Sequence, residues 1–189
     1  MIPMHVFRVR TFSAANALTL LLYGGLYVFT FFFPLNMIEI QGYTPSVTGL
    51  AFLPFALMLV LLSSVSGYLS DRFGPRPLLM LGTALGGFGF LWLSSIGINE
   101  KVSDLWTTFV PGLVMFGGGM AMIVAPLTAA VMTALPDQLT GVASGINNAV
   151  SRGAGALGIA IMGALGLALF GAELATAVGQ TDPTDNQIR

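Results

Sequence analysis

The sequence predicts an all-α membrane protein with about five transmembrane helices. Hydrophobic residues make up 55% of the 189 residues and only 8% carry charge, against about 25% in soluble domains. The charges leave five uncharged runs of at least 20 residues, the length that a helix needs to cross the hydrocarbon core. These runs do not alternate apolar and polar residues as the strands of a membrane barrel would. The helices are expected at 13–34, 46–67, 77–97, 106–133 and 141–171.

The first two helices have recognisable boundaries. The first is expected directly after Arg8 and Arg10, the last charges before a long apolar run. The second has a clear start, because Thr44 can accept a backbone hydrogen bond as its cap and Pro45 suits the first helical position. Pro54 lies inside this helix and lacks an N–H group, so it predicts a kink of the kind that membrane bundles tolerate.

The third and fourth helices differ in polar content and in their boundaries. The third has few polar positions apart from glycine, so we expect it at the periphery with its larger side chains facing lipid. Its candidates for lipid exposure are Leu78, Leu81, Leu85 and Phe88. Ser103 or Asp104 can cap the start of the fourth helix. Pro126 predicts a second kink, and Pro136 cannot continue this helix.

The fifth helix carries Arg152, which lies roughly 17 Å along it at a rise of about 1.5 Å per residue. In one interpretation this long side chain snorkels to the headgroup level. The other interpretation places it at a cavity mouth or between two halves of a larger bundle. Steps of four and three residues bring a polar and small-residue stripe onto its face: Gly141, Gly145, Asn148 and Gly155. Such a stripe should contact protein or water and not lipid.

The basic residues indicate how the chain is oriented in the membrane. Four arginines fall on one predicted side, whereas the loop at 98–105 on the other side has one lysine and two acids. The positive-inside rule then makes a lead-in at 1–12 cytoplasmic and the segment at 172–189 an extracytoplasmic tail or the start of a truncated loop. We therefore expect a multi-pass protein of the plasma (inner) membrane with a cytoplasmic N-terminus.

The sequence lacks the residues that several classes of chemistry need. The chain has no cysteine, and its single histidine, His5, has no second ligand-type residue nearby. We therefore expect neither a metal site nor a cofactor, and we do not expect an enzyme. The net charge of −1 gives no reason to expect a nucleic-acid partner. The lipid bilayer is the partner that the composition predicts.

The turn between the second and third helices gathers charges, glycines and prolines in the stretch SGYLSDRFGPRP, residues 66–77. One interpretation is a tight basic turn. The other gives the stretch a role, because Asp71 can lie near the N-terminus of the next helix, where the dipole favours an anion. Arg76 is then close enough to pair with it across the turn. The positions on which this second interpretation depends are Gly67, Asp71, Arg72, Gly74 and Arg76.

These five positions match the motif G-x-x-x-D-R-x-G-x-R, and in this the chain resembles the major facilitator superfamily of transporters. The elements SG-x-x-N and R-x-x-GALG in the fifth helix are similar to parts of the C-terminal half of the fourteen-span drug:proton antiporters. The resemblance implies that residues 13–171 form most of one six-helix half of a major facilitator fold. The resemblance also implies that the motif is a conformational switch. It further implies that the chain is a fragment that lacks the sixth helix and the N-terminal half.

The resemblance further implies a function. The intact protein is expected to be a proton-coupled secondary transporter that exports small amphipathic compounds or drugs across the plasma membrane. No Asp or Glu falls within a predicted span, so the acids that bind protons are expected on the missing half. The alternative is a non-transporting structural partner in the membrane or an inactive remnant of a transporter.

Aromatic and methionine side chains are candidates for the wall of a transport cavity. In the first helix, aromatic residues recur at every fourth position, and such faces suit lipophilic cations. Packing or anchoring at the membrane interface is the other interpretation of this stripe. Methionines add an adaptable apolar surface. The candidate cavity-lining residues are Tyr23, Tyr27, Phe31, Phe52, Phe55, Met58, Met115, Met122, Asn148 and Arg152.

Overall fold

The computed structural model describes the backbone of residues 4–97 and 105–180, and side chains within 5–97 and 105–173. Every regular element in these ranges is helical, which confirms the all-α prediction, and five of the helices are long and apolar enough to cross a membrane. The elements are η1 (Met4–Arg8), α1 (Arg10–Leu35), the π-helix η2 (Asn36–Ile40), α2 (Pro45–Phe73), α3 (Pro75–Ser94), α4 (Leu105–Thr133), η4 (Asp137–Leu139) and α5 (Thr140–Gln180).

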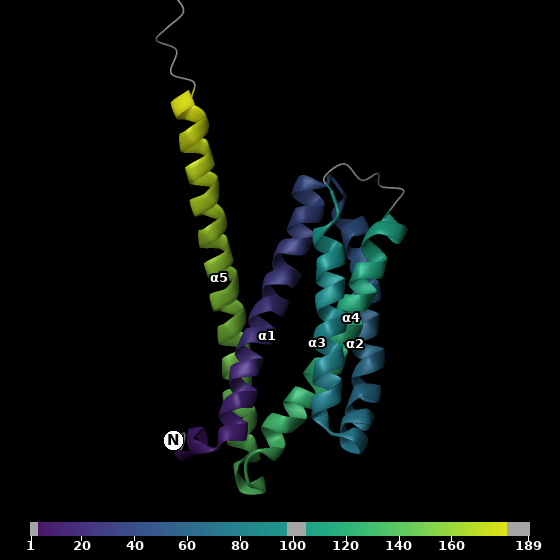
Figure 1. The fold of residues 1–189 in the computed structure, drawn as a ribbon, viewed down its shortest axis with the longest axis vertical. Coiled ribbons are helices and arrows are strands. Elements are labelled where there is room, and N and C mark those ends of the chain that lie inside the picture. The colour runs from purple at the N-terminus through teal and green to yellow at the C-terminus, as the bar shows by residue number, and fades with distance from the viewer. Residues whose placement is uncertain (1–3, 98–104, 181–189) are drawn as a thin grey trace, which may run out of the picture.

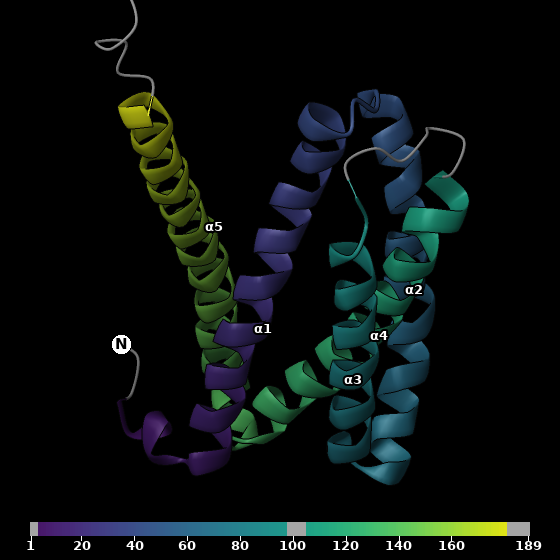
Figure 2. The same cartoon turned by 45° about the horizontal axis from the view of Figure 1, so that its top comes forward.

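The helices run alternately up and down, so that alternate turns lie at the same end. The N-terminal segment, the α2–α3 turn and the α4–α5 turn share one end, here called the basal end (Figure 1). This confirms the expectation that the N-terminus and the α2–α3 turn lie on one face. Helices α1 and α5 lie side by side, α2 and α3 flank α4, and α4 crosses from that group to the base of α1 and α5 (Figure 2).

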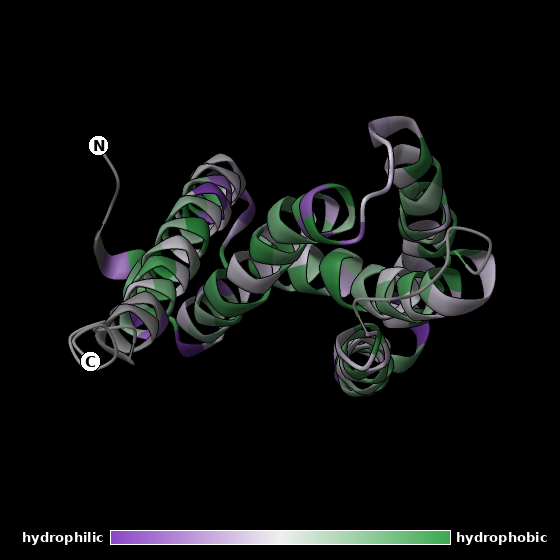
Figure 3. Ribbon diagram, turned by 90° about the horizontal axis from the view of Figure 1, so that it is seen from above, coloured by the Kyte–Doolittle hydropathy of each residue, from purple (hydrophilic) through white to green (hydrophobic). Residues whose placement is uncertain are grey.

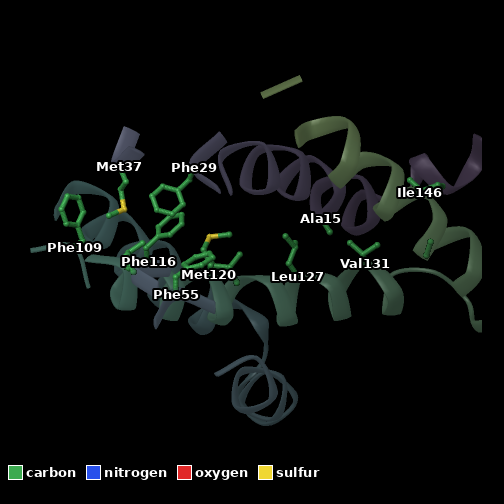
Figure 4. Close-up of a cluster of buried hydrophobic side chains, with 14 of the residues drawn as sticks. Ala15, Phe29, Met37, Phe55, Phe109, Phe116, Met120, Leu127, Val131 and Ile146 are labelled. Atoms are coloured by element: carbon green, nitrogen blue, oxygen red, sulfur yellow. The ribbon is translucent and has the colours of Figure 1, made fainter. Parts of the chain in front are cut away.

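Helix α4 is the centre of the bundle. Within its spanning segment 56% of the residues are buried, against 22% or less in the other four helices. Seen from above, hydrophobic residues lie on all sides of the helices, as expected for helices surrounded by lipid (Figure 3). The buried side chains form a row along α4 from Phe109 through Phe116 and Leu127 to Val131 (Figure 4).

A glycine-lined contact joins α3 to α4. Gly82, Gly86 and Gly89 are buried on one face of α3, and a Cβ at Gly89 would lie 2.8 Å from the Gly112 carbonyl oxygen. Lipid provides no hydrophobic force between helices, so close backbone approach is the main source of their association. These glycines therefore have a packing role.

Helix α3 lies at the periphery, as predicted. Phe88 is 63% exposed and Leu81 is also exposed, whereas Leu85 is half-buried. The expectation for Leu78 is wrong, because it is only 3% exposed. This residue shares the face of Gly82 and therefore points at α4.

The helix boundaries agree with the sequence signals at some positions and differ at others. The Val47 N–H donates to the Thr44 hydroxyl oxygen at 3.5 Å, which confirms the predicted cap with Pro45 as the first helical residue. Ser103 and Asp104, the expected caps of α4, lie outside the described residues. The π-helix after α1 was not predicted. The predicted end of the second helix at residue 67 is too early, because α2 continues to residue 73.

Candidate functional site

The α2–α3 turn owes its geometry to Gly74. This residue ends α2, directly precedes Pro75 at the start of α3, and has φ 81° and ψ 161°. Residues with a Cβ rarely adopt this backbone conformation, so the turn requires a glycine here. The Gly74 N–H donates to the Ser70 carbonyl at 2.8 Å and so closes the last turn of α2.

Gly74→Ala is expected to lower the free energy of unfolding by about 1–3 kcal/mol, because alanine is strained in this backbone conformation whereas glycine adopts it easily. Unfolding in detergent, followed by circular dichroism, measures the change. Gly87→Ala is the matched control, since a Cβ at this exposed position of α3 meets nothing within 4 Å. It should gain up to about 1 kcal/mol from helix propensity. Equal losses in the two variants would contradict the role given to Gly74.

The contacts of the charged residues in the motif differ in part from those that the sequence suggested. Asp71 lies in the last turn of α2, where the dipole of its own helix disfavours an anion, and it lines one cleft together with Pro75, the first residue of α3. Within the part of the chain that the structure describes, Asp71 and Arg76 do not form an ion pair. Arg72 lies over the ring of Phe73 at 5.6 Å. The exposed charges of the motif are therefore available to groups outside this turn.

Asp71 lines a cleft at the basal end. The cleft has a volume of about 440 Å³ and lies between the start of α1, the α2–α3 turn and the C-terminal half of α4. Small and weakly polar residues form its walls: Thr11, Ser70, Asp71, Pro75, Pro126, Ala129, Ala130, Thr133 and Ala134. A carboxylate on such a wall can meet a cation or a hydrogen-bond donor that enters from the basal side.

The aromatic stripe of α1 is divided between packing and exposure. Tyr23 lies near the side chain of Thr128 in α4, and its ring centroid is 6.4 Å from that of Tyr27. The Tyr27 ring covers Gly155 of α5, where a Cβ would lie 2.6 Å from it. Phe31 is exposed. Both tyrosines therefore contact a neighbouring helix, but Tyr27 remains 39% exposed, and Phe31 is the most exposed member of the stripe at 51%.

The candidates on α2 and α4 lie close to the core. Phe55 is 4% exposed and stacks on Phe116 at 5.7 Å, so its place differs from the expected cavity wall. The ring centroids of Phe52 and Phe55 are 5.2 Å apart, and both rings belong to the aromatic cluster around Phe29. The methionine candidates are half-buried: Met58, Met115 and Met122.

The stripe on α5 is open over most of its length. Asn148 and Arg152 are exposed, and the Asn148 amide donates to the Ser144 carbonyl at 3.2 Å within its own helix. A Cβ at Gly141 or Gly145 would meet nothing within 4 Å. Only the last member, Gly155, is covered, by α1. The open part is a polar surface that this chain itself does not fill.

A buried polar group between α1 and α5 was missed by the sequence reasoning. The Thr19 hydroxyl lies 3.1 Å from the Asn147 side-chain oxygen, and both residues are buried. Asn16, one turn earlier on α1, is buried with its side-chain oxygen unpartnered among the described residues. The stripe of small residues drew attention to Asn148. Its neighbour Asn147, about 100° around the helix, is the residue that faces α1.

A second cavity lies at the end opposite the base. Its volume is about 370 Å³, and Gln41, one of its lining residues, donates to the Gly97 carbonyl at 3.1 Å. Five aromatic residues contribute to its wall: Phe29, Phe32, Phe33, Phe90 and Phe109. The sequence reasoning named none of these five, because only their packing in space brings them together.

The chain is similar to known proteins over nearly its whole length. The profile of the Major Facilitator Superfamily matches residues 15–179. The multidrug resistance protein Stp of Mycobacterium tuberculosis is 31% identical over 174 residues, which cover 92% of this chain and 32% of that protein. No solved structure matches the chain significantly.

Two relatives from Streptomyces have names that refer to antibiotics. The tetracenomycin C resistance and export protein of Streptomyces glaucescens is 28% identical over 86% of this chain and 30% of its own length. The lincomycin resistance protein of Streptomyces lincolnensis is 29% identical over 85% of this chain and 33% of its own length. The chain thus spans about a third of the length of the curated relatives that it matches.

Proposed function

The chain belongs to the Major Facilitator Superfamily, a family of membrane transporters, and on this premise we propose that it is part of a proton-coupled exporter of small amphipathic compounds. The observation that carries the proposal is the similarity, over 85% or more of the chain, to relatives named for drug resistance and export. The chain corresponds to about a third of those relatives. We propose that it acts together with a further bundle that supplies the rest of the transport path.

Proton coupling in this proposal depends on residues outside the described spans. The described acids lie at helix ends or turns: Glu39 in η2, Asp71 in the last turn of α2, Asp137 in η4 and Glu173 near the far end of α5. An acid that carries protons across a membrane has to lie within it, where a carboxylate is retained only for function. We therefore assign the coupling acids to the further bundle.

The exposed polar stripe of α5 supports a place for this chain beside the transport path. Asn148 and Arg152 are open to the outside of the chain, and Phe31 offers an exposed aromatic face on α1. In lipid, an exposed amide and guanidinium would be costly, so a water-filled path or a protein partner is the more favourable neighbour. We propose that these three residues line the path, with the basal end in the cytoplasm.

Transport by the full-length protein in everted vesicles tests the proposal. When a proton gradient makes the vesicle interior acidic, a lipophilic cation such as ethidium is expected to accumulate inside, because protons leaving the vesicle drive the cation inward. Collapse of the gradient by nigericin should abolish the accumulation. Vesicles without the protein control for passive uptake. Accumulation that persists after nigericin would contradict proton coupling, and no accumulation above the control for any of several lipophilic cations would favour a non-transporting role.

A further inference from the structure

The segment formed by residues 5–10, which ends at the first residue of α1, is held against the basal end of the bundle. Val6 is completely buried, and the Ser13 hydroxyl donates a hydrogen bond of 2.6 Å to the Phe7 carbonyl. The rings of Phe7 and Phe12 meet edge to face with 5.9 Å between their centroids. This segment, here called the foot, turns sideways from the start of α1 (Figure 2) and precedes the part of the chain that matches the family.

The foot exposes apolar and basic side chains in alternation. Phe7 is 44% exposed and Val9 is also exposed, and Arg8 and Arg10 stand open beside them. Neither arginine has an ion-pair partner among the residues that the structure describes. An anionic lipid surface binds this combination, because apolar groups enter the boundary of the acyl chains while guanidinium groups meet the phosphates.

The position of the foot along the membrane normal favours lipid over a soluble partner. Arg10 is the first residue of α1, a helix long and apolar enough to span the membrane. The foot therefore lies at the level of the headgroups, where Arg and aromatic residues anchor membrane proteins. A soluble acidic protein would meet the two arginines but would leave Phe7 and Val9 in water.

We propose that the foot binds anionic phospholipids, with its two arginines on headgroup phosphates and Phe7 and Val9 at the boundary of the acyl chains. The leaflet that it meets follows from the proposed orientation, in which the basal end is cytoplasmic. The binding itself needs neither that orientation nor transport. It follows from free positive charge and exposed apolar area at one height in the bilayer.

Lipid quenching of a fluorophore at the foot tests this. The 189 residues contain no cysteine, so His5→Cys gives one labelling site in this chain, and Glu39→Cys gives a control site at the other end. The labelled full-length protein is placed in phosphatidylcholine nanodiscs that contain either phosphatidylglycerol or phosphatidylcholine with a nitroxide near the headgroup. We expect stronger quenching by the phosphatidylglycerol at position 5 and no such preference at position 39.

Charge variants identify the groups responsible. In R8Q/R10Q the preference for phosphatidylglycerol should fall by about fivefold for each arginine removed, and R8K/R10K should retain most of it. The matched control R72Q/R76Q removes the same charge from the α2–α3 turn and should leave the preference at position 5 unchanged. Circular dichroism of each variant reports whether the helices are intact, and R8K/R10K separates lost charge from lost folding.

Three results would overturn the proposal. The first is equal quenching by the two lipids at position 5 in the unchanged foot. The second is an equal loss of preference in R8Q/R10Q and R72Q/R76Q, which would assign the effect to overall charge. The third is the absence of quenching by either lipid, which would show that protein covers the foot. Nanodiscs present the same lipids on both faces, so these results do not depend on the proposed orientation. Quenching also requires no transport, so the results are independent of the proposed function.

Discussion

Gly119→Ala is expected to lower the free energy of unfolding by about 3 kcal/mol, the upper end of the range for overpacked cores. A Cβ here would lie 2.6 Å from both the Gly82 carbonyl oxygen and the Gly86 Cα, and it would also press on the Gly86 nitrogen. These are backbone atoms, so α3 has to move away from α4 to make room. Close packing holds helices together in lipid, and the pair therefore loses contacts along its length.

Unfolding of the purified protein by dodecyl sulfate in mild detergent, followed by circular dichroism, measures this effect. The matched control is Gly118→Ala at the next position of α4. A Cβ there would meet only the Leu85 Cδ2 at 3.6 Å, an ordinary contact. Alanine favours a helix over glycine by up to about 1 kcal/mol, so the control should be neutral or slightly stabilised. Equal destabilisation of the two variants would contradict the glycine-lined contact.

The spans could be predicted from the sequence because the bilayer imposes one length and excludes charge. All five expected ranges overlap the observed helices, and α4 at Leu105–Thr133 agrees to within a residue with the expected 106–133. The C-terminal end of α2 could not be placed, because charges such as Asp71 end a membrane span without ending a helix. The helix stops where the backbone of Gly74 leaves the helical region, a feature that hydropathy does not report.

The sequence did not show which helices would pack against one another. Periodicity shows which residues share a face, but it does not show which helix covers that face. Phe55 and Phe31 both fit an aromatic wall by spacing, yet α4 covers Phe55 and leaves Phe31 exposed. Asn147 and Asn148 are adjacent, and only contact with Thr19 of α1 distinguishes the buried one from the exposed one. The motif was found because its charges interrupt an apolar sequence.

Asp71→Asn in the full-length protein is expected to reduce efflux about tenfold, which corresponds to a shift of about 1.4 kcal/mol between two conformations. We propose that Asp71 and Arg76 form part of a latch whose partners lie outside this chain. Both are exposed at the basal end, and they are not paired with each other among the described residues. Exposed pairs are worth about 0.2–1 kcal/mol each, so the substitution reaches the required shift when Asp71 itself makes two or more contacts in the latch.

The effect on stability should have the opposite sign. Asp71 lies at the C-terminal end of α2, where loss of its negative charge removes an unfavourable interaction of about 0.3–1 kcal/mol with the helix dipole. The Asn variant should therefore be at least as abundant in the membrane as the unchanged protein. Arg76→Ala should also impair efflux at normal abundance. Asp137→Asn is the matched control, because it removes an exposed acid at the same end but outside the motif.

Membrane abundance by immunoblot and efflux of a lipophilic dye, measured in the same cells, separate the possible roles of the turn. If α2 requires Asp71 for folding or insertion, abundance and efflux fall together. If the stretch is only a basic turn, efflux is unchanged in both variants and equals that of Asp137→Asn. A latch lowers efflux alone. The dipole of α2 disfavours a carboxylate at this position, and the described residues supply Asp71 with no ion-pair or hydrogen-bond partner, so the latch assigns its favourable contact to a partner outside this chain.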